Sequence, residues 1–280
     1  LVPFAGGKFS ITEKNINQPY YIQVQTSPQT PAGEYTSTIT VKNNAAGEKV
    51  ECIFNLSVTV WDFTLPVTPS CETAMGLDKW YITEKHGVDY NSAEAEELNK
   101  KYYDYLLSRK ISAYYLPFDI LSDEADAYMS DPRVTSFMIP YPSDDDTLVR
   151  YYTKVSSNPV WAAKGFFYPI DEPATAEAYA TYCQMTDRLA RLCPGYNMVT
   201  PFYTYKFTDA GTEFNSVTQQ KGRSNIICSI SELFDEKGFA ADVAARVKDG
   251  DKSWWYVCCG PKGDYCNIFT HWEGIQHRLL

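Results

Sequence analysis

The spacing of apolar and polar residues divides the chain into two parts with different patterns. Residues 20–60 contain the β-rich runs "YYIQVQ", "YTSTITV" and "ECIFNLSVTV", of which the last two alternate polar and apolar positions. Alternation with a period of two, interrupted by Pro- and Gly-containing turns, predicts antiparallel strands. So few strands do not make a complete sandwich. We therefore expect residues 1–66 to form a partial antiparallel β-sandwich whose earlier strands are absent from this chain.

After Cys71 the pattern changes to short apolar runs that alternate with helical periodicity, which is typical of parallel βα units. One helix is expected in "YNSAEAEELNKKYYDYLLSRK", with Asn91 as the candidate N-cap, and another at 174–192, opened by Pro173. A third is expected around 239–247 and a last one in "IFTHWEGIQHRLL". The expected strands lie near 73–80, 112–118, 136–141, 165–170, 197–203, 225–230 and 253–259.

Repeated βα units after a β module predict an α/β fold of the (β/α)₈ (TIM) barrel type. Such barrels usually have about 250 residues. Residues 67–280 supply roughly one unit less, so we expect this barrel to lack its last strand. A doubly wound open sheet is the alternative, but no Gly-rich phosphate loop follows the first expected strand, which disfavours its nucleotide-binding form.

Charge and composition argue against several classes of function. Asp and Glu number 35 against 25 Lys and Arg, so the formal net charge is 25 − 35 = −10, and the basic residues form no stripe that would hold phosphates. We therefore expect no nucleic-acid partner. No run approaches the roughly 20 apolar residues that cross a bilayer, so no membrane-spanning segment is expected. Eight cysteines without a repeated C-x-x-C pair, and three histidines, argue against a zinc cluster and predict free, buried thiols.

The stretch "KGFFYPIDEPA" places two adjacent carboxylates, Asp171 and Glu172, before Pro173 and where a buried strand is expected to end. In (β/α)₈ barrels the active site lies at the C-terminal ends of the strands. Adjacent strand residues point to opposite faces, so both acids can address one ligand only if the chain bends here. The structural alternative is that Glu172 caps the helix that begins near Ala174.

Two carboxylates at the end of a barrel strand suggest glycoside hydrolysis. A conventional retaining enzyme holds its pair about 5–5.5 Å apart across the sugar, which suits sequence neighbours badly. Neighbouring acids suit a mechanism in which the substrate's own 2-acetamido oxygen attacks the anomeric carbon, one acid orients that group, and the other protonates the leaving oxygen. Glu232, after the sixth expected strand, is the candidate nucleophile for the conventional route.

The motifs "FFYPIDEP", "WWYVCCGP" and "YCNIFTHWEGIQHRLL", in this order, resemble glycoside hydrolase family 123, the β-N-acetylgalactosaminidases, and related uncharacterised barrel domains. The module with "PAGEYTSTITV" resembles the N-terminal β-sandwich of that family, so the resemblance covers residues 20–280. It implies that Asp171 orients the acetamido group and that Glu172 is the general acid and then the base. It also implies retention of configuration, no metal or organic cofactor, and a secreted, periplasmic or cell-surface location.

Aromatic residues make up 15% of the chain, which suits either a sugar-binding cleft or an aromatic-rich core. Successive residues of a strand such as "WWYVCCGP" face opposite sides. One of Trp254 and Trp255 is therefore expected to pack as core and the other to contact sugar. Each candidate has a structural role as its alternative. The candidate substrate-binding residues are Tyr203, Tyr256, Tyr141, Trp254, Asn267 and Trp80.

The sequence therefore favours an enzyme, a glycosidase that removes terminal β-linked N-acetylgalactosamine with assistance from the substrate. One alternative is a non-catalytic carbohydrate-binding or surface scaffold protein with a degenerate barrel. The other is a conventional two-carboxylate retaining glycosidase that uses Glu232. The expected partner is a glycan with a 2-acetamido sugar, and the sequence specifies no oligomeric state.

Overall fold

The computed structural model describes residues 22–42 and 51–258. Contacts within the chain divide it into two compact units, Leu1–Pro66 and Val67–Leu280. The expected C-terminal helix and the candidate residue Asn267 lie outside the described residues. None of the helices within the described ranges is long and apolar enough to cross a membrane.

In the first unit, two long strands form an antiparallel hairpin. β1 (Gly33–Lys42) pairs with β2 (Glu51–Val60) along their whole length, with Tyr35 opposite Val58 on the more apolar face. The run "YYIQVQ" was also expected to be a strand. Its described residues, 22–25, are irregular and pair with neither β1 nor β2. A partial sandwich around this hairpin stays a prediction.

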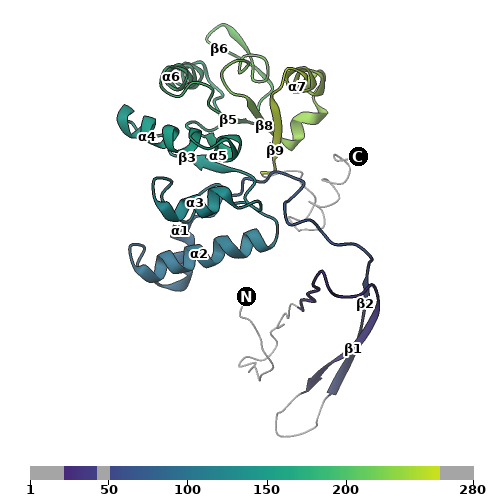
Figure 1. The fold of residues 1–280 in the computed structure, drawn as a ribbon. Coiled ribbons are helices and arrows are strands. Elements are labelled where there is room, and N and C mark those ends of the chain that lie inside the picture. The colour runs from purple at the N-terminus through teal and green to yellow at the C-terminus, as the bar shows by residue number, and fades with distance from the viewer. Residues whose placement is uncertain (1–21, 43–50, 259–280) are drawn as a thin grey trace. The chain divides into compact units, whose positions relative to one another are not determined.

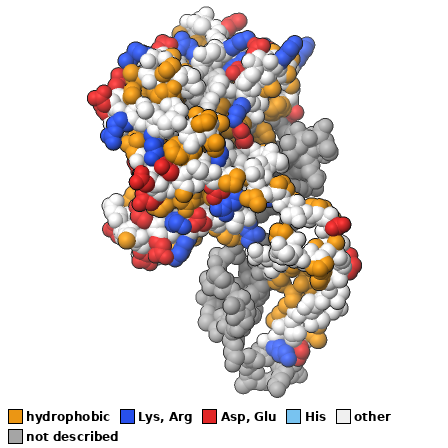
Figure 2. Space-filling view, viewed as in Figure 1, with side chains coloured by type: hydrophobic (Ala, Val, Ile, Leu, Met, Phe, Trp, Pro, Cys, Tyr) orange, Lys and Arg blue, Asp and Glu red, His pale blue; other side chains and the backbone are white. Residues whose placement is uncertain are grey.

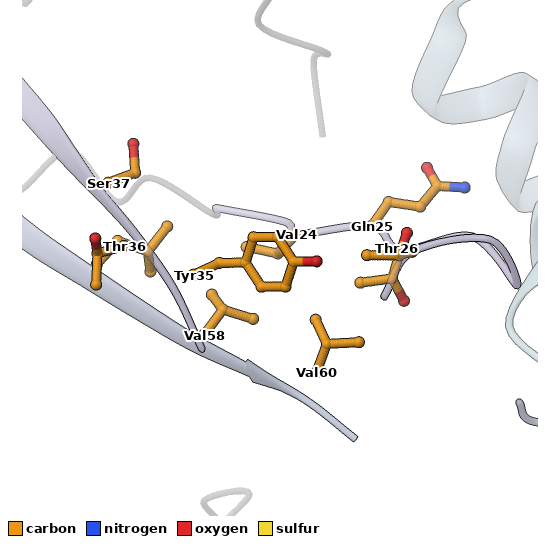
Figure 3. A pocket seen from close by; sticks show the side chains of 10 residues that line it. Val24, Gln25, Thr26, Tyr35, Thr36, Ser37, Val58 and Val60 are labelled. Atoms are coloured by element: carbon orange, nitrogen blue, oxygen red, sulfur yellow. The ribbon is translucent and has the colours of Figure 1, made fainter. Parts of the chain in front are cut away.

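The apolar face of the hairpin carries a shallow hollow of about 310 Å³. Figure 2 shows apolar side chains gathered over the hairpin. In Figure 3 the ring of Tyr35 lies among the side chains of Val24, Val58 and Val60. Among the described residues, apolar, hydroxyl and amide side chains line the hollow.

The second unit mixes helices with small parallel and antiparallel sheets. Its helices are α1 (Lys79–His86), α2 (Ala93–Ser108), α3 (Asp123–Ser130), α4 (Asp145–Ser156), α5 (Pro159–Lys164), α6 (Ala176–Leu192), the 3₁₀ helix η1 (Ser231–Asp235) and α7 (Phe239–Lys248). Its strands are β3 (Phe137–Ile139), β4 (Gly165–Phe167), β5 (Val199–Phe202), β6 (Lys206–Asp209), β7 (Thr212–Asn215), β8 (Ile226–Ile230) and β9 (Lys252–Tyr256). Figure 1 shows α2, α3, α4, α6 and α7 following one another along the outer side of the parallel strands.

The parallel segments of this unit follow one another in chain order. β3 pairs with β4, β5 pairs with β8, and β8 pairs with β9, all in parallel. Isolated parallel bridges extend the series, with Met75 beside Ala113 and Phe167 beside Met198. The antiparallel β6–β7 hairpin, which the sequence does not predict, lies in the chain between β5 and β8. No closed barrel is present in the part of the chain that the structure describes, and a closed (β/α)₈ barrel stays a prediction.

Helix caps correct two expectations about where elements begin. The strand expected at 73–80 is wrong, because the structure has only an isolated bridge at Met75 there, and the carboxylate of Asp78 accepts from the amide of Trp80 at 2.8 Å and starts α1. Ser92, rather than Asn91, caps α2, and its hydroxyl accepts from a first-turn amide at 3.1 Å. In both places one side-chain hydrogen bond, and not the hydrophobic pattern, determines the boundary.

Buried side chains lie on both sides of the parallel strands. Along β4, Phe167 packs in the main core with residues of the helices, whereas Phe166 packs on the other side of the strand. We call this second group the inner cluster. Its buried members are Phe166, Val199, Ile226 and Cys228, and its half-buried members are Ala74, Tyr114, Met138, Tyr168, Trp254 and Tyr256. Each parallel segment contributes to this cluster, an arrangement that suits the interior of a barrel.

Cysteine exposure differs from the expectation of buried thiols. Cys193 and Cys228 are buried and Cys183 is half-buried, but Cys52, Cys71 and Cys258 are exposed. Cys52 lies on the open hairpin of the first unit, and the other two exposed cysteines lie in irregular segments of the second. The expectation is therefore wrong for these three residues.

Two buried tyrosines allow a matched test of core packing. The hydroxyl of Tyr103, a residue 1% exposed, has no hydrogen-bond partner among the described residues, whereas that of Tyr182 is 3.0 Å from the Ser224 hydroxyl. Removing an unpaired buried hydroxyl is neutral or stabilising, because no hydrogen bond is lost. We expect Tyr103→Phe to preserve or raise the free energy of unfolding in urea, and Tyr182→Phe to lower it by about 1 kcal/mol. An equal loss in both variants would contradict this.

Candidate active site

Asp171 and Glu172 lie in an irregular segment between β4 and α6. β4 ends at Phe167, and α6 begins at Ala176 after Thr175, whose hydroxyl accepts from a first-turn amide at 3.1 Å. Because Thr175 is the N-cap, the alternative in which Glu172 caps this helix is wrong. The acids follow the C-terminal end of a parallel strand, where functional side chains gather in α/β folds.

The backbone at Glu172 is left-handed, with φ at 44°. Residues that carry a side chain rarely adopt this region, which costs of order 1–3 kcal/mol and persists only where surrounding contacts hold it. Pro173 follows directly and is buried, and a residue before proline normally has an extended backbone. Because β4 has already ended at Phe167, strand alternation does not force Asp171 and Glu172 to opposite faces.

A tyrosine hydroxyl donates a hydrogen bond to each of the two carboxylates. Tyr168 donates to Oδ1 of Asp171 at 2.7 Å, and Tyr256, at the end of β9, donates to Oε1 of Glu172. Both tyrosines belong to the inner cluster, although they lie far apart in the sequence. The two acids therefore reach one group of side chains, which is what neighbouring acids need to address a single ligand.

Burial and negative charge together shift the pKa values of side chains around the acids. Burial is the main cause that raises the pKa of Tyr256 and of Tyr168 well above the usual value, and the hydrogen bonds to Glu172 and Asp171 raise each further. Both tyrosines therefore stay neutral at physiological pH and keep the proton that they donate. Burial, and then the charge of Asp171, raises the pKa of the Cys228 thiol to about 12.

No ion pair among the described residues involves Asp171 or Glu172. Two carboxylates without a cationic partner in this part of the chain favour positive charge on a bound ligand. The tyrosine hydroxyls orient the carboxylates without cancelling their charge, because the hydroxyls are neutral. The arrangement can therefore stabilise a cationic intermediate and transfer a proton, which are two needs of glycoside hydrolysis.

Two of the predicted substrate-binding residues lie on β9 and in the inner cluster. Tyr256 contacts Glu172 directly. Trp254 packs edge-on against Phe166, with 5.3 Å between ring centroids, and its indole nitrogen donates to Glu72 at 3.0 Å. Of the two tryptophans of this strand, Trp254 therefore has the core position, and its contact with substrate stays a prediction.

Three other predicted residues lie on different elements. The ring centroid of Tyr141 is 6.5 Å from that of Phe167, and the guanidinium of Arg188 from α6 lies 4.8 Å from the Tyr141 centroid, so Tyr141 packs between strand and helix. Tyr203 follows β5 and is 49% exposed, and Trp80 lies on α1 and is 53% exposed. Such exposed rings suit stacking on a sugar, and their roles stay predictions.

Glu232, the candidate nucleophile of a conventional route, lies in η1 directly after β8. Its Oε2 accepts from the hydroxyl of Ser231 at 3.1 Å, and its side chain is half-buried. A third carboxylate thus follows a parallel strand of the same unit, so the conventional route requires an experimental test.

Sequence reasoning missed Tyr168 and Cys228 as neighbours of the acids. A signal for Tyr168 exists, because Phe166 and Tyr168 are two residues apart and a strand directs both to the same face. Cys228 lies near Asp171 through the pairing of strands that are far apart in sequence, and no local pattern specifies that pairing.

Comparison of the chain with models of known protein families finds no match, and comparison with curated proteins also finds none. The two acids, their tyrosine donors and the inner cluster are therefore the structural basis for a proposed function. The motif resemblance adds an expectation about the substrate.

The raised pKa of Cys228 predicts a difference in thiol reactivity. The thiolate is the reactive form, and a pKa of about 12 leaves roughly one Cys228 thiol in ten thousand ionised at pH 8. We expect iodoacetamide at pH 8 to modify the exposed Cys71 and to leave Cys228 of the folded protein unmodified, as measured by peptide mass spectrometry. After unfolding in urea, both thiols should react. Equal labelling in the folded protein would disprove the buried position of Cys228 beside Asp171.

Proposed function

We propose that the second unit is a glycoside hydrolase that removes terminal β-linked N-acetylgalactosamine by a substrate-assisted, retaining mechanism. The supporting observation is that Asp171 and Glu172 each accept a hydrogen bond from a tyrosine of one cluster. Neither acid forms an ion pair among the described residues, so their charge is available to a cationic intermediate. The resemblance of "FFYPIDEP" to family 123 favours a 2-acetamido sugar as the substrate.

In the first step, the carbonyl oxygen of the acetamido group attacks the anomeric carbon and forms a cyclic oxazolinium ion. Asp171 accepts a hydrogen bond from the acetamido N–H, which orients the group and stabilises its positive charge. The bond between the anomeric carbon and the leaving oxygen breaks, and Glu172 transfers its proton to that oxygen. An internal nucleophile has an effective molarity of about 10⁵ M or more, so the protein does not need to supply one.

In the second step, Glu172 is a carboxylate and takes a proton from an incoming water molecule. The water oxygen attacks the anomeric carbon on the face that the leaving group left, and the bond to the acetamido oxygen breaks. The acetamido group is restored, and Glu172 regains the protonated form in which it began. Two inversions at the anomeric carbon give net retention.

Glu172→Gln removes the proton that the leaving oxygen receives. We expect it to lower kcat on 4-methylumbelliferyl N-acetyl-β-D-galactosaminide by about 10²–10⁴-fold. Asp171→Asn should lower kcat by about 10²-fold, because the amide lacks the charge that stabilises the oxazolinium ion. Glu236→Gln, which changes an exposed carboxylate after η1, is the matched control and should keep wild-type activity. Circular dichroism of each variant would confirm that it is folded.

Three further outcomes separate this function from its alternatives. A thiazoline that mimics the oxazolinium ion should inhibit the wild-type protein competitively, and absence of inhibition would count against substrate assistance. Near-normal activity in Glu232→Ala would exclude the conventional two-carboxylate route, whereas its loss would favour that route. A wild-type protein that binds the sugar and hydrolyses none of it would instead be a carbohydrate-binding scaffold.

A further inference from the structure

We propose that Tyr256 is a positioning residue that determines which oxygen of Glu172 carries the proton for the leaving group. This role rests on the proposed function, because it defines the geometry of the general acid. It arises from a contact between β9 and the segment after β4, two parts of the chain that meet only in the folded protein.

Tyr256 occupies one of the two oxygens of Glu172. Its hydroxyl donates to Oε1, and its raised pKa keeps that hydroxyl protonated at neutral and acidic pH. A protonated carboxyl group has one hydroxyl oxygen and one carbonyl oxygen, and the carbonyl oxygen is the better acceptor. Oε1 is therefore the carbonyl oxygen when Glu172 is protonated, and the transferable proton is on Oε2.

Tyr256 is the more firmly held partner of the two. It pairs with Ile230 in the parallel ladder of β8 and β9, and its ring packs in the inner cluster. Glu172 lies in an irregular segment and has a left-handed backbone. Backbone strain of that kind and a side-chain hydrogen bond are both of order 1 kcal/mol, so loss of the Tyr256 hydroxyl allows Glu172 to change its orientation.

Tyr168 is the matched comparison within the same cluster, because it donates to Asp171 at 2.7 Å. Asp171 acts on the acetamido group in the proposed mechanism, so Tyr168 influences the nucleophile and not the leaving group. Tyr168→Phe and Tyr256→Phe each remove one hydroxyl and keep the ring. The two variants therefore disturb packing to a similar extent and differ in which acid they affect.

The test compares kcat/KM for aryl N-acetyl-β-D-galactosaminides whose leaving groups differ in acidity. Dinitrophenol leaves as a stable anion and needs little protonation, whereas phenol depends on the general acid. We expect Tyr256→Phe to lower kcat/KM by about 10²-fold for the phenyl glycoside and by less than about threefold for the dinitrophenyl glycoside. Tyr168→Phe should lower both by one common factor. Tyr105→Phe, at an exposed position on α2, should leave both unchanged.

Different results identify which of the two proposals fails. If Tyr256→Phe lowers kcat/KM by the same factor with every leaving group, the positioning role is overturned and the proposed function stands.

If the wild-type protein hydrolyses none of these glycosides, the proposed function fails. A double-mutant cycle on urea midpoints then tests the contact between Tyr256 and Glu172. A double variant as stable as Glu172→Ala alone would support Tyr256 as the anchor of Glu172. Additive shifts of Tyr256→Phe and Glu172→Ala would overturn it.

Discussion

The left-handed backbone at Glu172 is the constraint on which the geometry of the candidate site depends. β4 ends at Phe167, and this turn then sets the direction of the Glu172 side chain relative to Asp171. The turn, with φ at 44°, is unfavourable by about 1–3 kcal/mol, and a hydrogen bond contributes about 0.5–3 kcal/mol, with the upper part of that range for a charged acceptor. Because the two quantities are similar, the bond from Tyr256 can offset the strain. The segment after β4 and strand β9 therefore depend on each other, although neither is adjacent to the other in sequence.

Elements with a strong local signal could be predicted from the sequence. The alternation in β1 and β2 and the helical spacing in α2, α6 and α7 are visible without tertiary information. The sequence also predicted that Asp171 and Glu172 follow a buried strand, and β4 is buried and ends at Phe167. The first residues of helices were harder to predict from the sequence, because short polar side chains such as Asp78 and Ser92 determine them through single hydrogen bonds.

The partners of the acids could not be predicted as pairs, because they depend on the register of distant strands. Tyr256 is 84 residues after Glu172, and it reaches that acid because it stands opposite Ile230 in the ladder of β8 and β9. A slip of one residue would place Trp255 at that position and turn Tyr256 to the other face. Tyr141 shows the same limit, since its contact with Arg188 of α6 could not be predicted from the local sequence, and its contact with substrate stays a prediction.

The chemical identity of the donors explains how the site can be oriented and still carry negative charge. A lysine or arginine beside the acids would also donate hydrogen bonds, but its charge would offset that of the carboxylates. A tyrosine donates while neutral, and burial raises its pKa so that it remains neutral. The same burial that makes the inner cluster apolar thus keeps Tyr168 and Tyr256 protonated. Packing of the inner cluster and the electrostatics of the two acids therefore depend on the same burial. A change that admits water to the cluster would loosen its packing and lower the pKa values of the two tyrosines.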